Sequence, residues 1–263
     1  RAEAQILFAR LQSVIQRAAT SQDPAIPQMF QSLLSQAIDR ARLAQTLNPG
    51  DPQNWSTLAL VYEAVIPYVG GAGQFSIDAY DAASKFDPLN PELFFDSGRI
   101  RVGIGDLVFI RASNASGEAR QTLLRERDAL LAAAQEKFEE ALRLKPDYAP
   151  AHFLLAQVFD RRGDLNSAIR AAENTKILAF SDVGVAFQLG FLYYKADRLA
   201  NAAQEFERAV SLSENYSNAR YFLGLIYDRQ GRRQDAISQF EKILLLNQGH
   251  AEVEKILANL RAG

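Results

Sequence analysis

The second half of this chain repeats itself every 34 residues. The stretch YYKADRLANAAQEFERAVSLSE at residues 193–214 returns in similar form as YDRQGRRQDAISQFEKILLLNQ at residues 227–248. Three blocks of this length follow one another without a gap, and they begin at Ala149, Val183 and Ser217. Such a period indicates an array of similar supersecondary units, because a unit this small cannot bury its apolar faces alone.

Each block has the pattern of two amphipathic helices. Two stretches of about 12 to 14 residues carry apolar residues at spacings of three and four, and polar turns with Gly163, Asp197 and Gly231 separate them. We therefore predict a helical hairpin in each block, with small residues where the paired helices cross. These small residues stand at places eight and twenty: Ala156, Gly190, Gly224, Ala168, Ala202 and Ala236.

Two earlier blocks fit the same places when insertions are allowed. The block from Pro52 has Trp55 at place four and continues at Ser76 after five extra residues. The block from Pro91 resumes its second half at Ala134 after 24 extra residues. The spacing between the insertions keeps the period, so the array is predicted to start near residue 52.

This set of places, W-x2-L-G/A-x2-Y followed by A-x3-F-x2-A-x4-P, resembles the tetratricopeptide repeat family over residues 52–250. The resemblance implies an all-α fold, a right-handed α-solenoid of tandem helix-turn-helix repeats, whose inner groove binds peptides. Arg101 departs from the pattern at place eleven, and such departures are expected to mark locally looser packing or altered turns rather than another fold. The five repeats are expected at residues 52–90, 91–148, 149–182, 183–216 and 217–250.

The ends and the long insertion lie outside the regular pattern. Residues 1–51 are expected to form an atypical hairpin, and residues 251–263 a helix that caps the last repeat. The GIG at residues 103–105 is predicted to end one helix, and a long helix is predicted from near Ser116 to just before Pro146. Two interpretations stay open for the front half of that helix: it folds back on a neighbouring hairpin, or it is a dedicated contact element.

Composition argues against several classes of function. The chain has 29 Lys and Arg against 31 Asp and Glu, and this net charge of −2 provides no basic surface for nucleic acid. It has no Cys, and no catalytic, phosphate-binding or metal-ligand spacing is found. No apolar run approaches the roughly 18 to 20 residues of a membrane span. We therefore expect no enzyme activity, no cofactor, no metal ion and no direct membrane insertion by this chain.

The remaining candidate surface is one stripe on the first helix of each block. Places five, nine and twelve share a face by the i, i+4, i+7 rule, and this face is markedly aromatic. Aromatic side chains anchor partners with a large contact area at little cost in rotamer freedom. Two interpretations stay open for the rings at place five: they line a groove for a partner, or they pack against the adjoining hairpin. The candidate groove residues are Phe95, Arg99, Val102, Phe153, Gln157, Asp160, Phe187, Phe191, Tyr194, Tyr221, Leu225 and Asp228.

The leading hypothesis is a non-enzymatic protein–protein interaction scaffold that holds an apolar peptide or helix segment in the aromatic groove. The alternative is a structural spacer or self-assembly arm of a larger bacterial protein, which self-associates through residues 107–130. The chain begins at Arg1 rather than Met, so we expect a piece of a longer protein that another segment could anchor to a membrane. No sequence feature assigns a cytoplasmic or an extracytoplasmic location.

Overall fold

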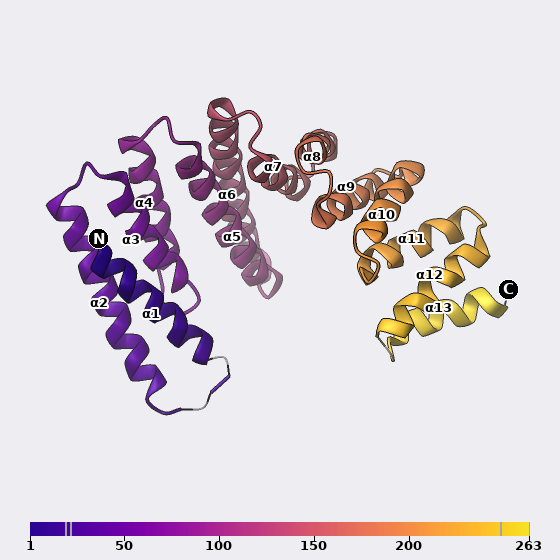
Figure 1. The fold of residues 1–263 in the computed structure, drawn as a ribbon, viewed down its shortest axis with the longest axis horizontal. Coiled ribbons are helices and arrows are strands. Elements are labelled where there is room, and N and C mark those ends of the chain that lie inside the picture. Colours follow the sequence, from indigo (N-terminus) through magenta and orange to yellow (C-terminus); the bar gives the residue numbers. More distant parts are fainter. Residues whose placement is uncertain (19, 22, 248, 263) are drawn as a thin grey trace. The chain divides into compact units, whose positions relative to one another are not determined.

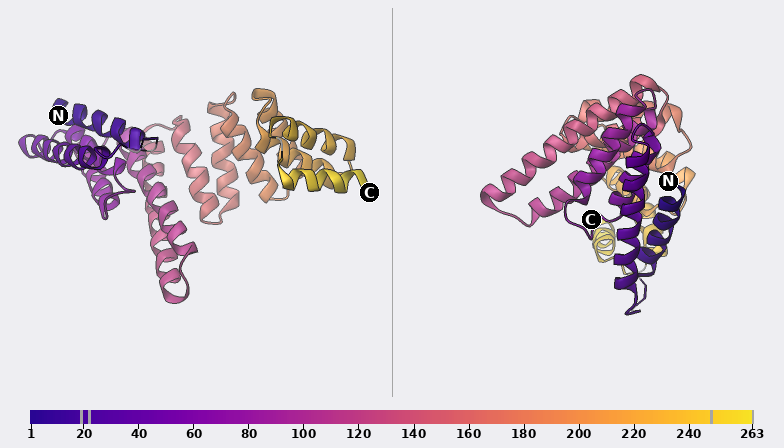
Figure 2. Two further views of the ribbon diagram at one scale, coloured as in Figure 1. Left: turned by 90° about the horizontal axis from the view of Figure 1, so that it is seen from below. Right: turned by 90° about the vertical axis from the view of Figure 1, so that its left-hand side faces the viewer.

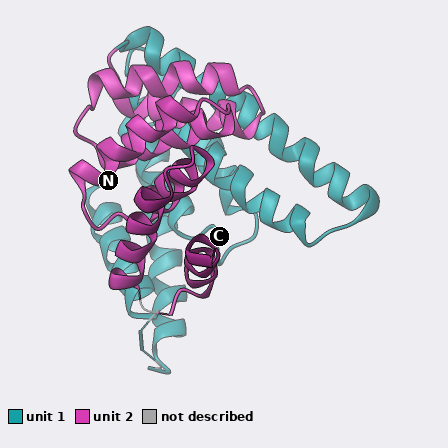
Figure 3. Cartoon of the chain, turned by 90° about the vertical axis from the view of Figure 1, so that its right-hand side faces the viewer, with its two compact units in different colours: residues 1–146 teal, residues 147–263 magenta. Residues whose placement is uncertain are grey.

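A computed structural model of the chain describes residues 1–18, 20–21, 23–247 and 249–262. All regular secondary structure within these residues is α-helical (Figures 1 and 2). The chain divides into two compact units, residues 1–146 and residues 147–263 (Figure 3). The helical content agrees with the apolar spacing of the sequence.

Unit 1 consists of three antiparallel helical hairpins. Apolar faces of the first five helices share one core, in which Leu11, Val61 and Tyr80 are fully buried. Asp51 and Asn90 cap the two helices that start with proline, since each side chain accepts a hydrogen bond from a backbone N–H of the first turn. The helices are α1 (Ala2–Ala18), α2 (Ile26–Leu47), α3 (Pro52–Ala64), α4 (Ala72–Phe86), α5 (Pro91–Ser113) and α6 (Gly117–Leu144).

The long insertion extends both helices of the third hairpin. The prediction that a helix ends at residues 103–105 is wrong, because α5 continues through them to Ser113. Gly105 packs against Leu131 of α6, so contact with the partner helix compensates for the low helix propensity of glycine. With 23 residues against 13 in α3, α5 is about 15 Å longer than α3. The long helix runs from Gly117 to Leu144, as predicted, and its front half pairs with the extension of α5.

Unit 2 consists of three shorter hairpins and a final helix, which packs on α12. The turns inside the hairpins have a positive φ at the same place of each block, +83° at Gly163, +56° at Asp197 and +74° at Gly231. The helices are α7 (Ala149–Arg161), α8 (Leu165–Leu178), α9 (Val183–Lys195), α10 (Leu199–Leu212), α11 (Ser217–Arg229), α12 (Arg233–Leu246) and α13 (Ala251–Ala262). The final helix lies in the stretch predicted to cap the last repeat, and residue 263 lies outside the described residues.

Small residues at place eight lie against large rings at place twenty-four. The ring of Phe240 is so close to Gly224 that an added Cβ would stand 2.7 Å from a ring carbon. Gly190 faces Phe206 in the same way, at 2.9 Å. Both rings are fully buried, so the two helices of each hairpin approach as closely as the small residues allow.

Successive hairpins within each unit are joined by a recurring side-chain contact. It links place eleven of one repeat to the residue 20 positions earlier, on the second helix of the preceding hairpin. The pairs are Tyr62 with Arg42 at 2.7 Å, Arg101 with Asp81 at 2.5 Å, Tyr193 with Glu173 at 2.6 Å and Tyr227 with Glu207 at 2.8 Å. The contact satisfies a polar group at the border of the core and fixes the register of neighbouring hairpins.

One buried carboxylate also joins two hairpins of unit 2. Glu205 on α10 is 2% exposed and accepts from Lys176 Nζ of α8 at 2.5 Å and from Arg208 Nε at 2.8 Å. A buried charge of this kind persists only when it is paired.

Candidate partner groove

One pocket of unit 2 brings together five of the twelve predicted groove residues. Its volume is about 450 Å³, and its walls come from α7, α9 and the residue before α11. The predicted residues in the lining are Phe153, Gln157, Asp160, Phe187 and Phe191. The lining residues that were not among the predicted groove residues are Arg161, Gly184, Gln188, Leu192 and Tyr216.

Helical spacing explains why these side chains meet. Phe153, Gln157 and Asp160 are four and three residues apart on α7, so they share one face of that helix. Phe187 and Phe191 occupy the equivalent places on α9, which contacts the α7–α8 hairpin through α8. Two copies of one stripe, each from a consecutive repeat, therefore line the same pocket.

Phe187 belongs to the pocket and to the core at once. Its ring centroid lies 5.7 Å from that of the buried Phe206 and 5.3 Å from that of Tyr216, which itself lines the pocket. Phe191 packs edge-on to Phe222 with centroids 5.3 Å apart. Phe187 therefore packs on neighbouring rings and also lines the pocket, while its use by a partner stays a prediction.

Phe222, at the centre of this aromatic cluster, was missed by the sequence reasoning. Its ring contacts those of Phe191, Tyr194, Phe206 and Tyr221, with centroids 5.3 to 5.7 Å apart. Phe222 stands at place six, where the four preceding blocks have Thr, Asp, Leu and Gln, so the repeat pattern carries no aromatic signal there.

Polar side chains form the rim of the pocket. Lys195 Nζ pairs with Asp160 Oδ1, and the same ammonium lies 5.8 Å from the centroid of Phe191. Arg161 Nη1 donates to Gln157 Oε1 at 3.0 Å. The amide of Gln188 donates to the carbonyl of Phe153 at 3.2 Å, and among the described residues its own Oε1 is buried without a hydrogen-bond partner. Apolar walls with a few polar groups are typical of binding pockets.

The predicted stripe of the last repeat lies outside this pocket lining. The hydroxyl of Tyr221 donates to Glu252 Oε1 of α13 at 2.8 Å, and burial together with this bond raises the pKa of Tyr221. Leu225 is half-buried and Asp228 is exposed. Tyr194 is half-buried and packs on Phe222. The final helix therefore uses part of the stripe that the sequence assigned to a partner.

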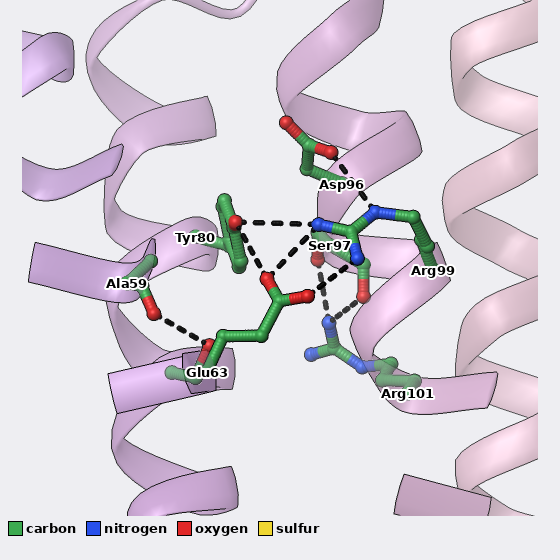
Figure 4. A network of polar contacts seen from close by, with 8 residues as sticks. Ala59, Glu63, Tyr80, Asp96, Ser97, Arg99 and Arg101 are labelled. Carbon is green, nitrogen blue, oxygen red and sulfur yellow. Dashed lines mark hydrogen bonds and ion pairs between the residues drawn. The ribbon is translucent and has the colours of Figure 1, made fainter. Parts of the chain in front are cut away.

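In unit 1 the predicted stripe contributes to internal contacts. Arg99 forms a bidentate ion pair with Glu63, with Nη1 to Oε1 at 2.5 Å and Nη2 to Oε2 at 2.9 Å, and its Nε donates to Asp96 (Figure 4). The hydroxyl of Tyr80 donates to the same Glu63 carboxylate, and burial raises the pKa of Tyr80. The other two predicted residues of this repeat are also engaged, since Val102 is only 6% exposed and the ring of Phe95 packs on that of Phe138.

The expectation of looser packing at Arg101 is not met. Its side chain is 8% exposed, and it donates to Asp81 at 2.5 Å and to the carbonyl of Ser97 at 2.8 Å. Burial raises the pKa of Asp81, but hydrogen bonds from Arg101 and Ser97 outweigh it and leave the pKa below its usual value. Arg101 therefore replaces a tyrosine with an ion pair at the same inter-hairpin contact.

In the part of the chain that the structure describes, no group of three or more His, Asp or Glu side chains is arranged to hold a metal ion. No described helix combines the length and the apolar character that crossing a membrane demands.

Comparisons with family models support the repeat pattern in two stretches. Residues 118–177 and residues 193–260 each match a model described as a tetratricopeptide repeat. A comparison with curated proteins gives no match.

Solved structures resemble this chain in fold. A crystal structure of MamA is 22% identical, with a TM-score of 0.55, and the match covers 72% of this chain and 92% of MamA. A fragment of MamA from Desulfovibrio magneticus RS-1 is 16% identical, with a TM-score of 0.59 and coverage of 76% and 97%. YrrB, described as a TPR protein with an unusual peptide-binding site, is 17% identical, with a TM-score of 0.61 and coverage of 82% and 96%.

Identities this low establish the fold alone. The helices and these structural matches confirm the predicted fold class, an all-α solenoid of tandem helix-turn-helix repeats.

Proposed function

Because this chain is a tetratricopeptide repeat protein, with a fold suited to protein–protein interaction, we propose that unit 2 binds an apolar peptide or helix segment in the pocket between the first helices of its first two repeats. The role is non-enzymatic. The fold of YrrB, which is described as having a peptide-binding site, is compatible with this use.

The observation that carries the proposal is the convergence of Phe153, Phe187, Phe191 and Tyr216 on one pocket of about 450 Å³. Rigid rings lose little conformational freedom on binding, and removing their exposed faces from water stabilises a complex by roughly 25 cal/mol per Å² of apolar area. The volume suits one or two large side chains of a partner rather than a whole folded surface.

The polar rim restricts what can enter. The Asp160 carboxylate and the Lys195 ammonium already neutralise each other, so a strongly charged segment gains little there. The amides of Gln157 and Gln188 stand beside the rings and can exchange hydrogen bonds with a peptide backbone. We therefore propose a segment with one or two aromatic or large aliphatic anchors and little net charge.

The test is peptide selection on the full chain, followed by affinity measurement. Peptides from a displayed random library are enriched on immobilised protein, and their dissociation constants are measured by calorimetry for the wild type and for Phe153→Ala. We expect roughly fivefold or greater weakening for Phe153→Ala, since loss of a well-placed anchor at an interface costs more than about 1 kcal/mol.

The matched control is Phe180→Ala, which removes an exposed ring of unit 2 that does not line the pocket. Helical content and thermal unfolding are recorded for both variants. Selected peptides that bind Phe153→Ala as tightly as wild type would refute the proposed groove, and so would equal weakening by Phe180→Ala.

A further inference from the structure

A second exposed apolar surface lies on unit 1, at the insertion hairpin, which we define as residues 103–130. On its α5 side, Leu107 is 43% exposed, Phe109 is 47% exposed and Ile110 is 58% exposed. The guanidinium of Arg127 lies 4.8 Å from the centroid of Phe109 and covers part of that ring. Figure 3 shows the hairpin extending away from the other helices of unit 1. Three large apolar side chains within four residues of an exposed helix are costly to leave in water.

The base of this surface is a cleft rather than a flat face. A pocket of about 520 Å³ forms where the insertion hairpin meets the α3–α4 loop. Its apolar lining includes Ile66, Val69, Ile104, Leu107, Ile110 and Leu130. The hairpin packs closely at the floor of the cleft, since a Cβ added to Gly73 would stand 2.9 Å from Ile104. The cleft is therefore held in shape by the fold.

The charges beside the cleft are of both signs. Arg111 of α5 and Glu126 of α6 both belong to its lining and are exposed. Neither side chain forms a hydrogen bond or ion pair with another described residue. Residues 103–130 carry four Arg and four acidic residues, a net charge of zero.

From this arrangement we propose that the cleft is the interface for a second copy of this chain, related by a twofold axis that crosses it. In an isologous contact each patch meets its own image. An axis passing between Arg111 and Glu126 sets the arginine of each copy against the glutamate of the other, and it places the Ile110 of each copy at the apolar cleft of the other. The same surface therefore provides both partners of the ion pairs and both partners of the apolar contact.

Charge distinguishes this occupant from others. An anionic membrane surface attracts segments with a clear excess of Lys and Arg, and the insertion hairpin has none. A strongly acidic or basic protein would leave one of the two unpaired charges facing a like charge. A second copy of the same surface pairs both charges, because it presents Glu126 to Arg111 and Arg111 to Glu126.

The expected association is weak. Because the contact involves one hairpin from each copy, we expect it to bury less than the roughly 800 Å² per partner of a standard interface and to have a dissociation constant of about 1 to 100 µM. The contact is independent of the proposed pocket in unit 2, so peptide binding and dimerisation can fail separately.

The test is a charge exchange measured by sedimentation velocity on the full chain, over a concentration series up to about 1 mM. In the symmetric dimer, residue 111 of each copy faces residue 126 of the other. Either single charge reversal, Arg111→Glu or Glu126→Arg, therefore creates two contacts between like charges. Each is expected to weaken self-association by at least about tenfold. Mixing the two variants restores both attractive pairs in a heterodimer, so the mixture should associate about as well as the wild type.

Matched controls separate this interface from general effects of charge. Arg125→Glu and Glu118→Arg make the same changes on the insertion hairpin outside the cleft lining, and they should leave association unchanged. Ile110→Ser should abolish dimerisation while circular dichroism shows unchanged helical content. A monomeric wild type at all concentrations overturns the proposal, and so does a dimer that is insensitive to both charge reversals or is not recovered on mixing.

Discussion

The contact between Gly224 and Phe240 makes the repeat packing quantitatively testable through Gly224→Ala. Alanine is favoured over glycine inside a helix by about 1 kcal/mol. The added Cβ would stand 2.7 Å from the ring of Phe240, which is fully buried. Overpacking of this kind costs about 1 to 3 kcal/mol. Since this ring is fully enclosed, we expect the cost near the upper end and a net loss of about 1 to 2 kcal/mol.

Gly103→Ala is the matched control. Gly103 also lies inside a helix, but nothing lies within 4 Å of an added Cβ, so only the helix propensity changes. This variant should gain about 0.5 to 1 kcal/mol. The difference between the two variants is then the packing cost alone.

The assay is urea unfolding followed by far-ultraviolet circular dichroism, with a double-mutant cycle that adds Phe240→Leu. The smaller side chain makes room for the new Cβ, so it should cost less in the Gly224→Ala background than in the wild type, with a coupling of about 0.5 to 3 kcal/mol. If Gly224→Ala stabilises the chain as much as Gly103→Ala does, or the cycle shows no coupling, close approach at place eight does not hold the hairpin together.

Two further predictions concern buried polar contacts. Burial and the bond to Glu207 raise the pKa of Tyr227 to about 12, above its usual value near 10, so its contribution to stability is complete below pH 10 and falls as pH rises towards 12. Tyr227→Phe should lose about 1 kcal/mol at pH 8 and show a shallower decline in unfolding free energy between about pH 10 and 12; an unchanged decline contradicts this. Glu205→Ala should lose about 3 kcal/mol because it leaves two cations beside a buried gap. Glu241→Ala, which removes an exposed pair, should lose less than about 1 kcal/mol, and equal losses in urea unfolding would argue against the buried ion pair.

The regular part of the fold could be predicted because its signal recurs. The first helices of the repeats begin at residues 52, 91, 149, 183 and 217, the positions at which the sequence blocks begin. Comparison of the same five blocks also identified the small residues at place eight. Repetition turns weak single-site preferences into a pattern that chance does not produce.

The insertion could be predicted only in part, because it occurs once. Helical spacing between Ser116 and Pro146 placed α6 well, while the two glycines of GIG argued for a helix end in α5. Glycine lowers helix propensity by only about 1 kcal/mol, and tertiary contact with α6 outweighs that preference. Nothing in the local sequence reports that contact.

The candidate groove shows a related limit. Helical geometry grouped Phe153, Gln157 and Asp160 on one face, and the structure brings them to the same pocket as Phe187 and Phe191. It could not tell which copies of the stripe face a pocket and which are engaged by other elements. That depends on residues outside the stripe, such as Glu63 beside Arg99 in unit 1 and Glu252 beside Tyr221 in unit 2.

The inter-hairpin contact at place eleven explains why residue identity alone misleads. A tyrosine there donates to a glutamate 20 positions earlier in two repeats, and it accepts from an arginine in another. Where arginine takes the place, the earlier residue is aspartate. A repeat can therefore change either partner without losing the bond, provided that the pair still joins a donor to an acceptor. A consensus residue scored alone marks Arg101 as a defect, whereas the same residue scored with Asp81 is a satisfied contact. What the repeats retain at this contact is thus the residue pair that spans two hairpins. This pair is visible in the sequence only when positions 20 residues apart are considered together.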